Sequence, residues 1–229
     1  MRTCVRLLAP CDREWAAQEN RKLRRLRRQF SDLRDAQIRL DVVVGMSASR
    51  RMQMQADTLS RARESLDCAR RHAWSEHGPA AAIWQRSSRS LEQLCERTLQ
   101  WPFAQLRRTH LESAQRLAEQ KLRRALKHAG DARSQKIRHR LRQRLRAANS
   151  LQLLNAELRA EPACATTAAR ARLARALGKE RDLWLANKAL MGECPEAAKL
   201  VQSTLQRQRK RNARAIEKLP STAPARRDA

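Results

Sequence analysis

The sequence predicts an all-α fold, and three observations support this prediction. Ala, Leu, Arg, Gln and Glu dominate the composition, and most of them are strong helix formers. Tyr is absent, Phe occurs twice and β-branched residues are sparse, which argues against a β-sheet protein. Apolar residues also recur at helical spacing, as at Leu23, Leu26, Phe30 and Leu33, which share one face of a helix.

The helices expected in the first half cover residues 12–43, 48–73 and 80–99. The first of them is expected to be broken or re-phased near Ser31-Asp32. Gly45 and Ser47 indicate a turn after it. His77-Gly78-Pro79 predicts a stop and a restart, because Pro suits the first turn of a helix.

The helices expected in the second half cover residues 101–129, 132–158, 164–177, 180–191 and 195–219. Trp101-Pro102 opens the first of them, and Gly130-Asp131 and Glu161-Pro162 are the expected breaks that follow. Gly178 is expected to separate two shorter helices. Residues 219–229 are rich in Pro, Ala, Arg and Ser, so a disordered tail is predicted there.

Two short segments echo each other, and their context indicates an internal duplication. They are Leu33-Arg34-Asp35-Ala36 and Glu180-Arg181-Asp182-Leu183. Each Arg-Asp pair follows a basic amphipathic helix and begins another helix, where an Asp is favourable. We therefore expect a single helical domain over 1–218, built from pseudo-symmetric halves over about 1–99 and 100–218.

The charge balance predicts a polyanionic partner. Fifty Lys and Arg face twenty-three Asp and Glu, which gives a formal net charge of +27. A compact fold with so much like charge repels itself unless a polyanion or salt neutralises it. The excess lies within helical segments rather than in a tail, so the partner is expected to bind the folded domain.

The strongest candidate site is one face of the helix around residues 138–146. His139, Arg142 and Arg146 share this face, and the apolar stripe that begins at Ile137 lies on another side. Arginine offers planar bidentate donors that match phosphate oxygens. A solvated charged face is the alternative, but acids are nearly missing from 132–156, so neutralising pairs along the helix cannot form.

A second basic face is formed by Arg21, Arg24 and Arg28. If the two halves pack with pseudo-twofold symmetry, both basic helices could line one central groove, with Lys121 and Arg124 adding to its wall. A phosphate chain bound there would release condensed counterions, so its affinity would fall steeply with salt.

Several segments, taken in order, resemble a known family. They are Arg2–Pro10, Glu19-Asn20-Arg21-Lys22-Leu23-Arg24, Leu33-Arg34-Asp35-Ala36, Trp101-Pro102, Lys121-Leu122-Arg123-Arg124-Ala125-Leu126, His139-Arg140-Leu141-Arg142-Gln143-Arg144-Leu145-Arg146 and Leu177-Gly178-Lys179-Glu180-Arg181-Asp182-Leu183. Their order and spacing, from about residue 4 to 215, are similar to the conserved histidine α-helical domain (CHAD) family.

The resemblance implies two four-helix-bundle halves around a basic central groove that binds inorganic polyphosphate without catalysis. It also implies a cytoplasmic protein associated with polyphosphate granules. The sequence departs from the family twice. Only Arg2–Pro10 matches the end of the first histidine helix, so that helix is expected to be truncated. An aromatic position of the family falls within Ala147–Ser150.

These arguments give one set of expected anion-binding residues: Arg2, Arg6, Arg21, Arg24, Arg28, Arg34, Lys121, Arg124, Arg138, His139, Arg142 and Arg146. No metal is predicted, because Cys68 and His72 have helical spacing but no second pair at ligand spacing. No cofactor and no enzymatic activity are expected, because no phosphate-binding Gly-rich loop and no Ser/His/Asp order are present.

Two other functions remain open. Net charge alone supports sequence-independent nucleic-acid binding equally well, although no zinc finger, RNA-binding motif or helix-turn-helix signature is present. A basic scaffold that docks on acidic proteins or anionic membranes through Arg207–Arg211 is the third possibility. No apolar run of eighteen residues exists, so no transmembrane helix is expected.

Overall fold

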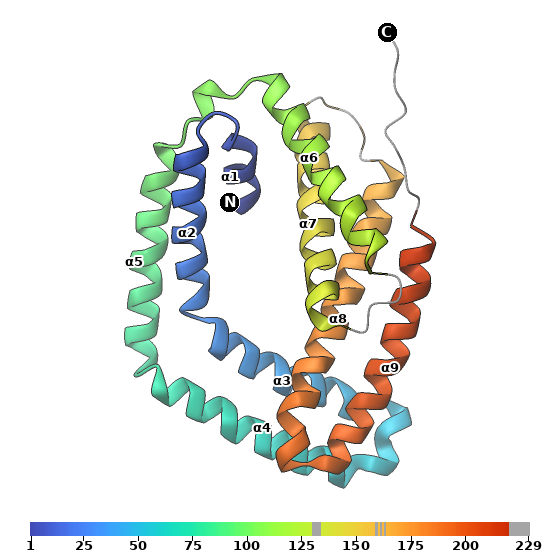
Figure 1. The fold of residues 1–229 in the computed structure, drawn as a ribbon. Helices are drawn as coiled ribbons and strands as arrows, with labels where there is room; N and C mark the ends of the chain where they lie inside the picture. Colours follow the sequence, from blue (N-terminus) through green and yellow to red (C-terminus); the bar gives the residue numbers. More distant parts are fainter. Residues whose placement is uncertain (130–133, 159, 161, 163, 220–229) are drawn as a thin grey trace.

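The computed structural model describes residues 1–129, 134–158, 160, 162 and 164–219, and all regular structure in this part is helical (Figure 1). The all-α prediction is therefore confirmed. The α-helices are α1 (Arg2–Leu8), α2 (Arg13–Arg28), α3 (Ser31–Ser47), α4 (Ala56–Glu76), α5 (Ala80–Leu99), α6 (Arg108–Lys127), α7 (Gln135–Leu158), α8 (Ala165–Glu193) and α9 (Pro195–Glu217). Two short 3-10 helices are η1 (Arg50–Gln55) and η2 (Phe103–Gln105).

Several predicted boundaries agree with the structure. α2 ends at Arg28 and α3 begins at Ser31, so the predicted break in the first helix is confirmed. Gly78 and Pro79 separate α4 from α5, and Gly78 has a φ of 87°, in the left-handed region that favours glycine. The predictions made for Gly130-Asp131, Glu161 and residues 220–229 lie outside the described residues.

The predicted turn lies directly after Ser47, at Ala48, and its predicted start at Gly45 is wrong, because α3 continues to Ser47. Val43 and Met46 on either side of Gly45 are buried in a helical core, and this packing outweighs the low helix propensity of glycine. At the other boundary, Trp101 does not open a helix. It is buried against Trp15 and Phe103, and α6 begins only at Arg108.

The predicted break at Gly178 is also wrong. α8 runs without interruption from Ala165 to Glu193. A Cβ atom at Gly178 would lie 3.0 Å from Nη2 of Arg142 and 3.2 Å from its Cζ. Glycine here therefore allows the close approach of a side chain from α7, and the helix itself does not end.

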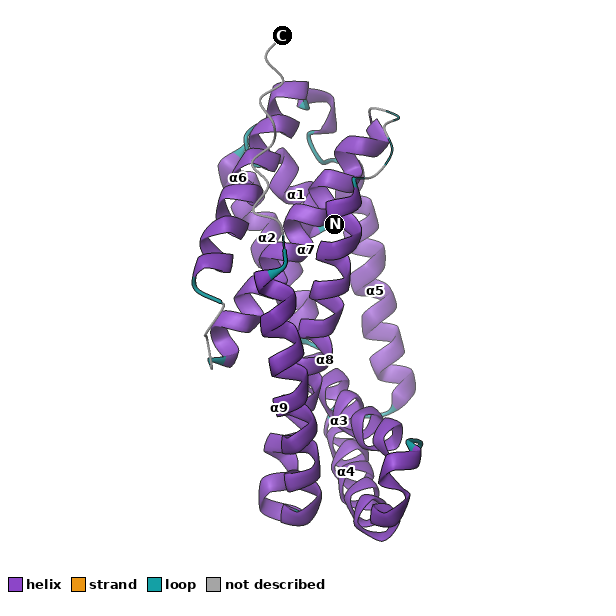
Figure 2. Ribbon diagram, turned by 90° about the vertical axis from the view of Figure 1, so that its right-hand side faces the viewer, coloured by secondary structure: helices purple, strands orange, loops and turns teal. Residues whose placement is uncertain are grey.

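The hydrophobic core has three main parts, and α8 and α9, which pack against each other, contribute to two of them. The first core joins α3 and α4 to the C-terminal half of α8 and the N-terminal half of α9. The second joins α6 and α7 to the other halves of α8 and α9. The third joins α1, α2 and α5. Figures 1 and 2 show α8 and α9 side by side along the molecule, with α3 and α4 at one end.

Residues from both predicted halves thus share one core, since Val43 and Leu59 pack with Leu190 and Val201. The pseudo-symmetric relation of the halves stays a prediction. Among the described helices, none is both long and apolar enough to cross a membrane.

Candidate anion-binding site

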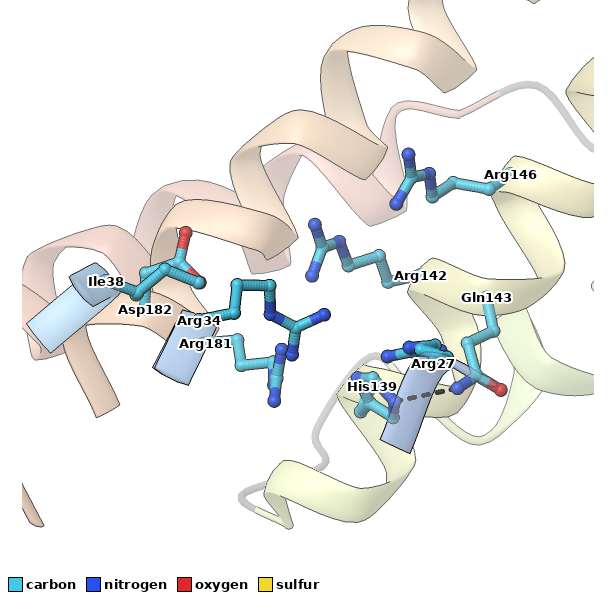
Figure 3. Close-up of a pocket in the computed structure, with 9 residues that line it drawn as sticks. All are labelled: Arg27, Arg34, Ile38, His139, Arg142, Gln143, Arg146, Arg181 and Asp182. Atoms are coloured by element: carbon cyan, nitrogen blue, oxygen red, sulfur yellow. Dashed lines mark hydrogen bonds between the residues drawn. The ribbon is translucent and has the colours of Figure 1, made fainter. Parts of the chain in front are cut away.

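A pocket of about 230 Å³ lies where the C-terminal end of α2 and the N-terminal half of α3 meet the N-terminal half of α7 and the middle of α8 (Figure 3). We call it the first pocket. It is lined by Arg27, Arg34, Ile38, His139, Arg142, Gln143, Arg146, Arg181 and Asp182. Five arginines and one histidine therefore line this pocket, and among the described residues Asp182 is its only lining residue with a carboxylate.

The two echoing segments meet at this pocket. Arg34 of α3 and Arg181 of α8 both line it, and Nη2 of Arg181 lies 3.3 Å from Oδ2 of Asp35. Asp35 also pairs with Arg34, with 2.6 Å between Oδ1 and Nη2. One carboxylate is thus shared by two arginines, which leaves a net positive charge at the wall of the pocket.

α7 supplies the opposite wall, and here the sequence prediction agrees with the structure. His139, Arg142 and Arg146 all line the first pocket, as their common helix face indicated. Figure 3 shows Arg142 and Arg146 extending from α7 toward the side from which Arg34 extends. Arg27, Arg142 and Arg146 form no hydrogen bond or ion pair with any residue of the described chain.

The polar atoms of α7 that are buried without a hydrogen-bond partner include the Nε of Arg142 and the Nδ1 of His139. The other ring nitrogen of His139 lies 2.7 Å from the side-chain nitrogen of Gln143. Buried polar groups are normally satisfied, and exceptions of this kind concentrate at functional sites. The local protein environment therefore leaves the cationic groups of α7 under-satisfied.

A second pocket, of about 250 Å³, adjoins the first because Arg142 and Arg146 line both. Its other lining residues are Asn149 and Ser150 of α7 and Ala171, Ala174 and Arg175 of α8. The two pockets thus follow one another along α7 and share an arginine pair between them.

The pKa shifts of the lining groups indicate an excess of positive charge at a partly buried site. Burial, followed by repulsion from Arg181 and Arg142, holds the pKa of His139 below its ordinary value. Burial and neighbouring arginines also lower the pKa values of Arg27 and Arg142. Burial raises the pKa of Asp182 although Arg142 and Arg181 act against this change. An added anion would relieve the repulsion among the cations.

Arg138 is not available to a ligand, which corrects its place among the expected anion-binding residues. It is only 6% exposed, and its Nη1 lies 2.9 Å from Oε2 of the fully buried Glu180. Asn212 of α9 donates to the same carboxylate oxygen at 2.8 Å. The sequence around Arg138 has almost no acidic residues, and Glu180 of α8 supplies the carboxylate that pairs with it.

The predicted basic face of α2 is also displaced. Arg21, Arg24 and Arg28 are exposed and line neither pocket, whereas Arg27 lines the first. Arg27 lies four residues after the buried Leu23 and so continues the row that faces the rest of the molecule. An arginine in register with a buried row is the signal that could have identified it.

Three other expected residues lie elsewhere. Arg6 of α1, Lys121 and Arg124 of α6 line neither pocket. They form a separate basic group with Arg144, because the pKa of Lys121 is lowered by burial and then by Arg144, Arg6 and Arg124. The side chain of Arg2 lies outside the described part. Arg27, Arg175 and Arg181 are the lining arginines that the expected set does not contain.

Replacing Gly178 by Ala or Val should weaken anion binding without unfolding the protein. The new side chain would push the Arg142 guanidinium aside, and this group has no ion pair to lose. For Ala, stability should change by at most about 1 kcal/mol, because a better helix former offsets the contact. For Val, affinity should fall by roughly tenfold. Thermal melts and anion titrations check this, and equal affinity of all three proteins would contradict it.

Scans against protein-family models, curated proteins and solved structures found no match to this chain. The resemblance to the CHAD family therefore stays a prediction, and function has to be inferred from the two pockets. Among the described residues, no group of three His, Cys, Asp or Glu side chains could hold a metal ion.

Proposed function

We propose that this protein binds inorganic polyphosphate, without catalysis, through the two adjoining pockets. The observation that supports this most is the first pocket, where five arginines and His139 face one carboxylate. Three of these arginines have no partner in the described chain. A cytoplasmic location at polyphosphate granules belongs to the same proposal.

A linear phosphate chain suits the shape of this site. The pockets follow one another, so successive phosphoryl groups would meet Arg34 and Arg181, then Arg142 and Arg146, then Arg175. Each guanidinium can donate two parallel hydrogen bonds to phosphate oxygens. Because the site is half-buried, these charge-assisted bonds would be screened less than those on an open surface.

Binding should strengthen as the pH falls through the pKa of His139 in the complex. The pKa of His139 is lowered in the free protein, and a bound anion favours the protonated ring and raises it. Linkage then requires the affinity to rise as the pH falls through the pKa of the complex, and to level off below that of the free protein. Titrations from pH 8 to 5 check this, and His139→Gln should flatten the profile. An unchanged profile would contradict the role of His139.

Replacing Asp182 by Asn should increase the affinity for polyphosphate on the order of tenfold. Asp182 is the one carboxylate that lines the first pocket, and it forms no ion pair within the described chain. Glu92→Gln on α5 is the matched control, because it changes the net charge equally at an exposed site. A similar gain in polyphosphate affinity for both variants would mean that the affinity depends on net charge alone and not on the carboxylate in the first pocket.

The decisive experiment is a competition between long-chain polyphosphate and duplex DNA at equal phosphate concentration. Labelled polyphosphate bound to the protein is expected to resist displacement by DNA, since a duplex is too wide for pockets of about 230 and 250 Å³. Displacement by DNA at parity would overturn the proposal in favour of sequence-independent nucleic-acid binding. Failure of polyphosphate to bind at all would also overturn the proposal.

A further inference from the structure

The second pocket differs in chemistry from the first. In the first, five of the nine lining residues are arginines. In the second, the shared arginines and Arg175 stand beside the neutral side chains of Asn149 and Ser150 and the methyl groups of Ala171 and Ala174. A ligand made only of phosphates would leave this neutral and apolar part of the wall unused.

Asn149 gives the second pocket a hydrogen-bond acceptor, its Oδ1, which an ionised phosphate cannot satisfy although it can accept from the amide nitrogen. Its Oδ1 is buried and has no hydrogen-bond partner. The amide can therefore turn toward a ligand without losing a bond made by that oxygen. A fully ionised phosphate chain presents only acceptors, whereas the Oδ1 of Asn149 needs a donor such as a hydroxyl or an amino group.

The remaining wall suits a flat ring. Ala171 and Ala174 contribute only methyl groups, so a planar group can approach α8 closely. Arg175 is exposed at the edge of the pocket, and a guanidinium stacks favourably on an aromatic face. Each pocket alone is smaller than the roughly 300–1,000 Å³ usual for small-molecule sites, but the two adjoin.

We infer that the site takes a nucleoside polyphosphate, with its phosphates in the first pocket and its nucleoside in the second. This inference rests on the proposed function, because the phosphates occupy the same arginine cluster. Arg142 and Arg146, which line both pockets, hold the phosphate nearest the sugar. Asn149 and Ser150 bond the sugar hydroxyls or the amino group of the base, while Arg175 covers the ring.

The test compares ATP with inorganic tripolyphosphate, both with EDTA to exclude divalent ions. Tripolyphosphate carries more charge, so electrostatics alone would make it the tighter ligand. The wild-type protein is expected to bind ATP at least about tenfold more tightly, because ring stacking and added hydrogen bonds are each worth that order. Ala171→Leu should fill the second pocket and abolish this preference, because it should weaken ATP binding far more than the binding of tripolyphosphate, whose three phosphates mainly contact the first pocket.

The control is Ala168→Leu, an exposed position one turn earlier on α8, which should keep the preference. Asn149→Ala is the second variant, expected to reduce the preference by severalfold without filling the pocket. If the wild type binds both ligands equally, or if Ala171→Leu weakens both alike, the nucleoside assignment is wrong and phosphate binding stands. If neither ligand binds and long-chain polyphosphate does not bind either, the proposed function fails as well.

Discussion

Replacing Glu180 by Ala is expected to lower the free energy of unfolding by about 3–5 kcal/mol. Glu180 is fully buried in α8, and its carboxylate holds Arg138 of α7 at 2.9 Å and Asn212 of α9 at 2.8 Å. Truncating it removes the buried carboxylate that pairs with Arg138 and accepts a hydrogen bond from Asn212. The loss of these buried polar contacts should cost far more than the loss of packing. Urea denaturation of both proteins measures the difference.

Two further variants separate this charge effect from simple truncation. Glu196→Ala removes the carboxylate of an exposed pair, with 3.1 Å between the carboxylate and Arg61, and should cost no more than about 1 kcal/mol. The double variant Arg138→Met/Glu180→Leu should recover most of the lost stability, because well-packed apolar residues can replace a buried ion pair. A cost for Glu180→Ala as small as that for Glu196→Ala would show that the buried pair does not hold α7 to α8.

Replacing both Arg142 and Arg146 by Gln should weaken polyphosphate binding by at least about 100-fold. Both residues line both pockets and neither has a partner in the described chain. The slope of log affinity against log salt should also become shallower by roughly 1.4, at about 0.7 for each lost phosphate contact. Isothermal titration at several salt concentrations gives both quantities.

The matched control is Arg207→Gln/Arg211→Gln, which removes the same charge from exposed positions on α9. This variant should bind polyphosphate within about threefold of the wild type, because only diffuse attraction is lost. Neither pair of substitutions should destabilise the fold, since Arg142 and Arg146 mainly repel their neighbours. Equal losses in both variants would mean that net charge binds the polymer and that the pockets have no special role.

The helical segments could be predicted from the sequence because helix formation depends on local spacing and on residues close in the chain. The breaks at Ser31 and at Gly78-Pro79 follow from the same local rules. The common face of His139, Arg142 and Arg146 is a property of one helix, so it too was predictable. The role of Gly178 could not be predicted from the sequence, because the side chain that approaches it, Arg142, lies on another helix.

The sequence could likewise not predict which arginines have no ion pair. Arg138 and Arg142 are one helical turn apart and look alike in the sequence. One is neutralised by an acid 42 residues away, and the other has no partner in the described chain. Arg27 reaches the first pocket while Arg24 does not, because the buried row of α2 determines how the helix is turned.

The amino-acid pattern alone predicts a helical protein with a large excess of arginine and one helix face nearly free of local acids. Which arginines meet around a pocket, and which are neutralised, depends on how the helices pack in three dimensions. The reason is physical: helical periodicity acts over a few residues, whereas an ion pair depends on distance in space and can join any two helices that the core brings together.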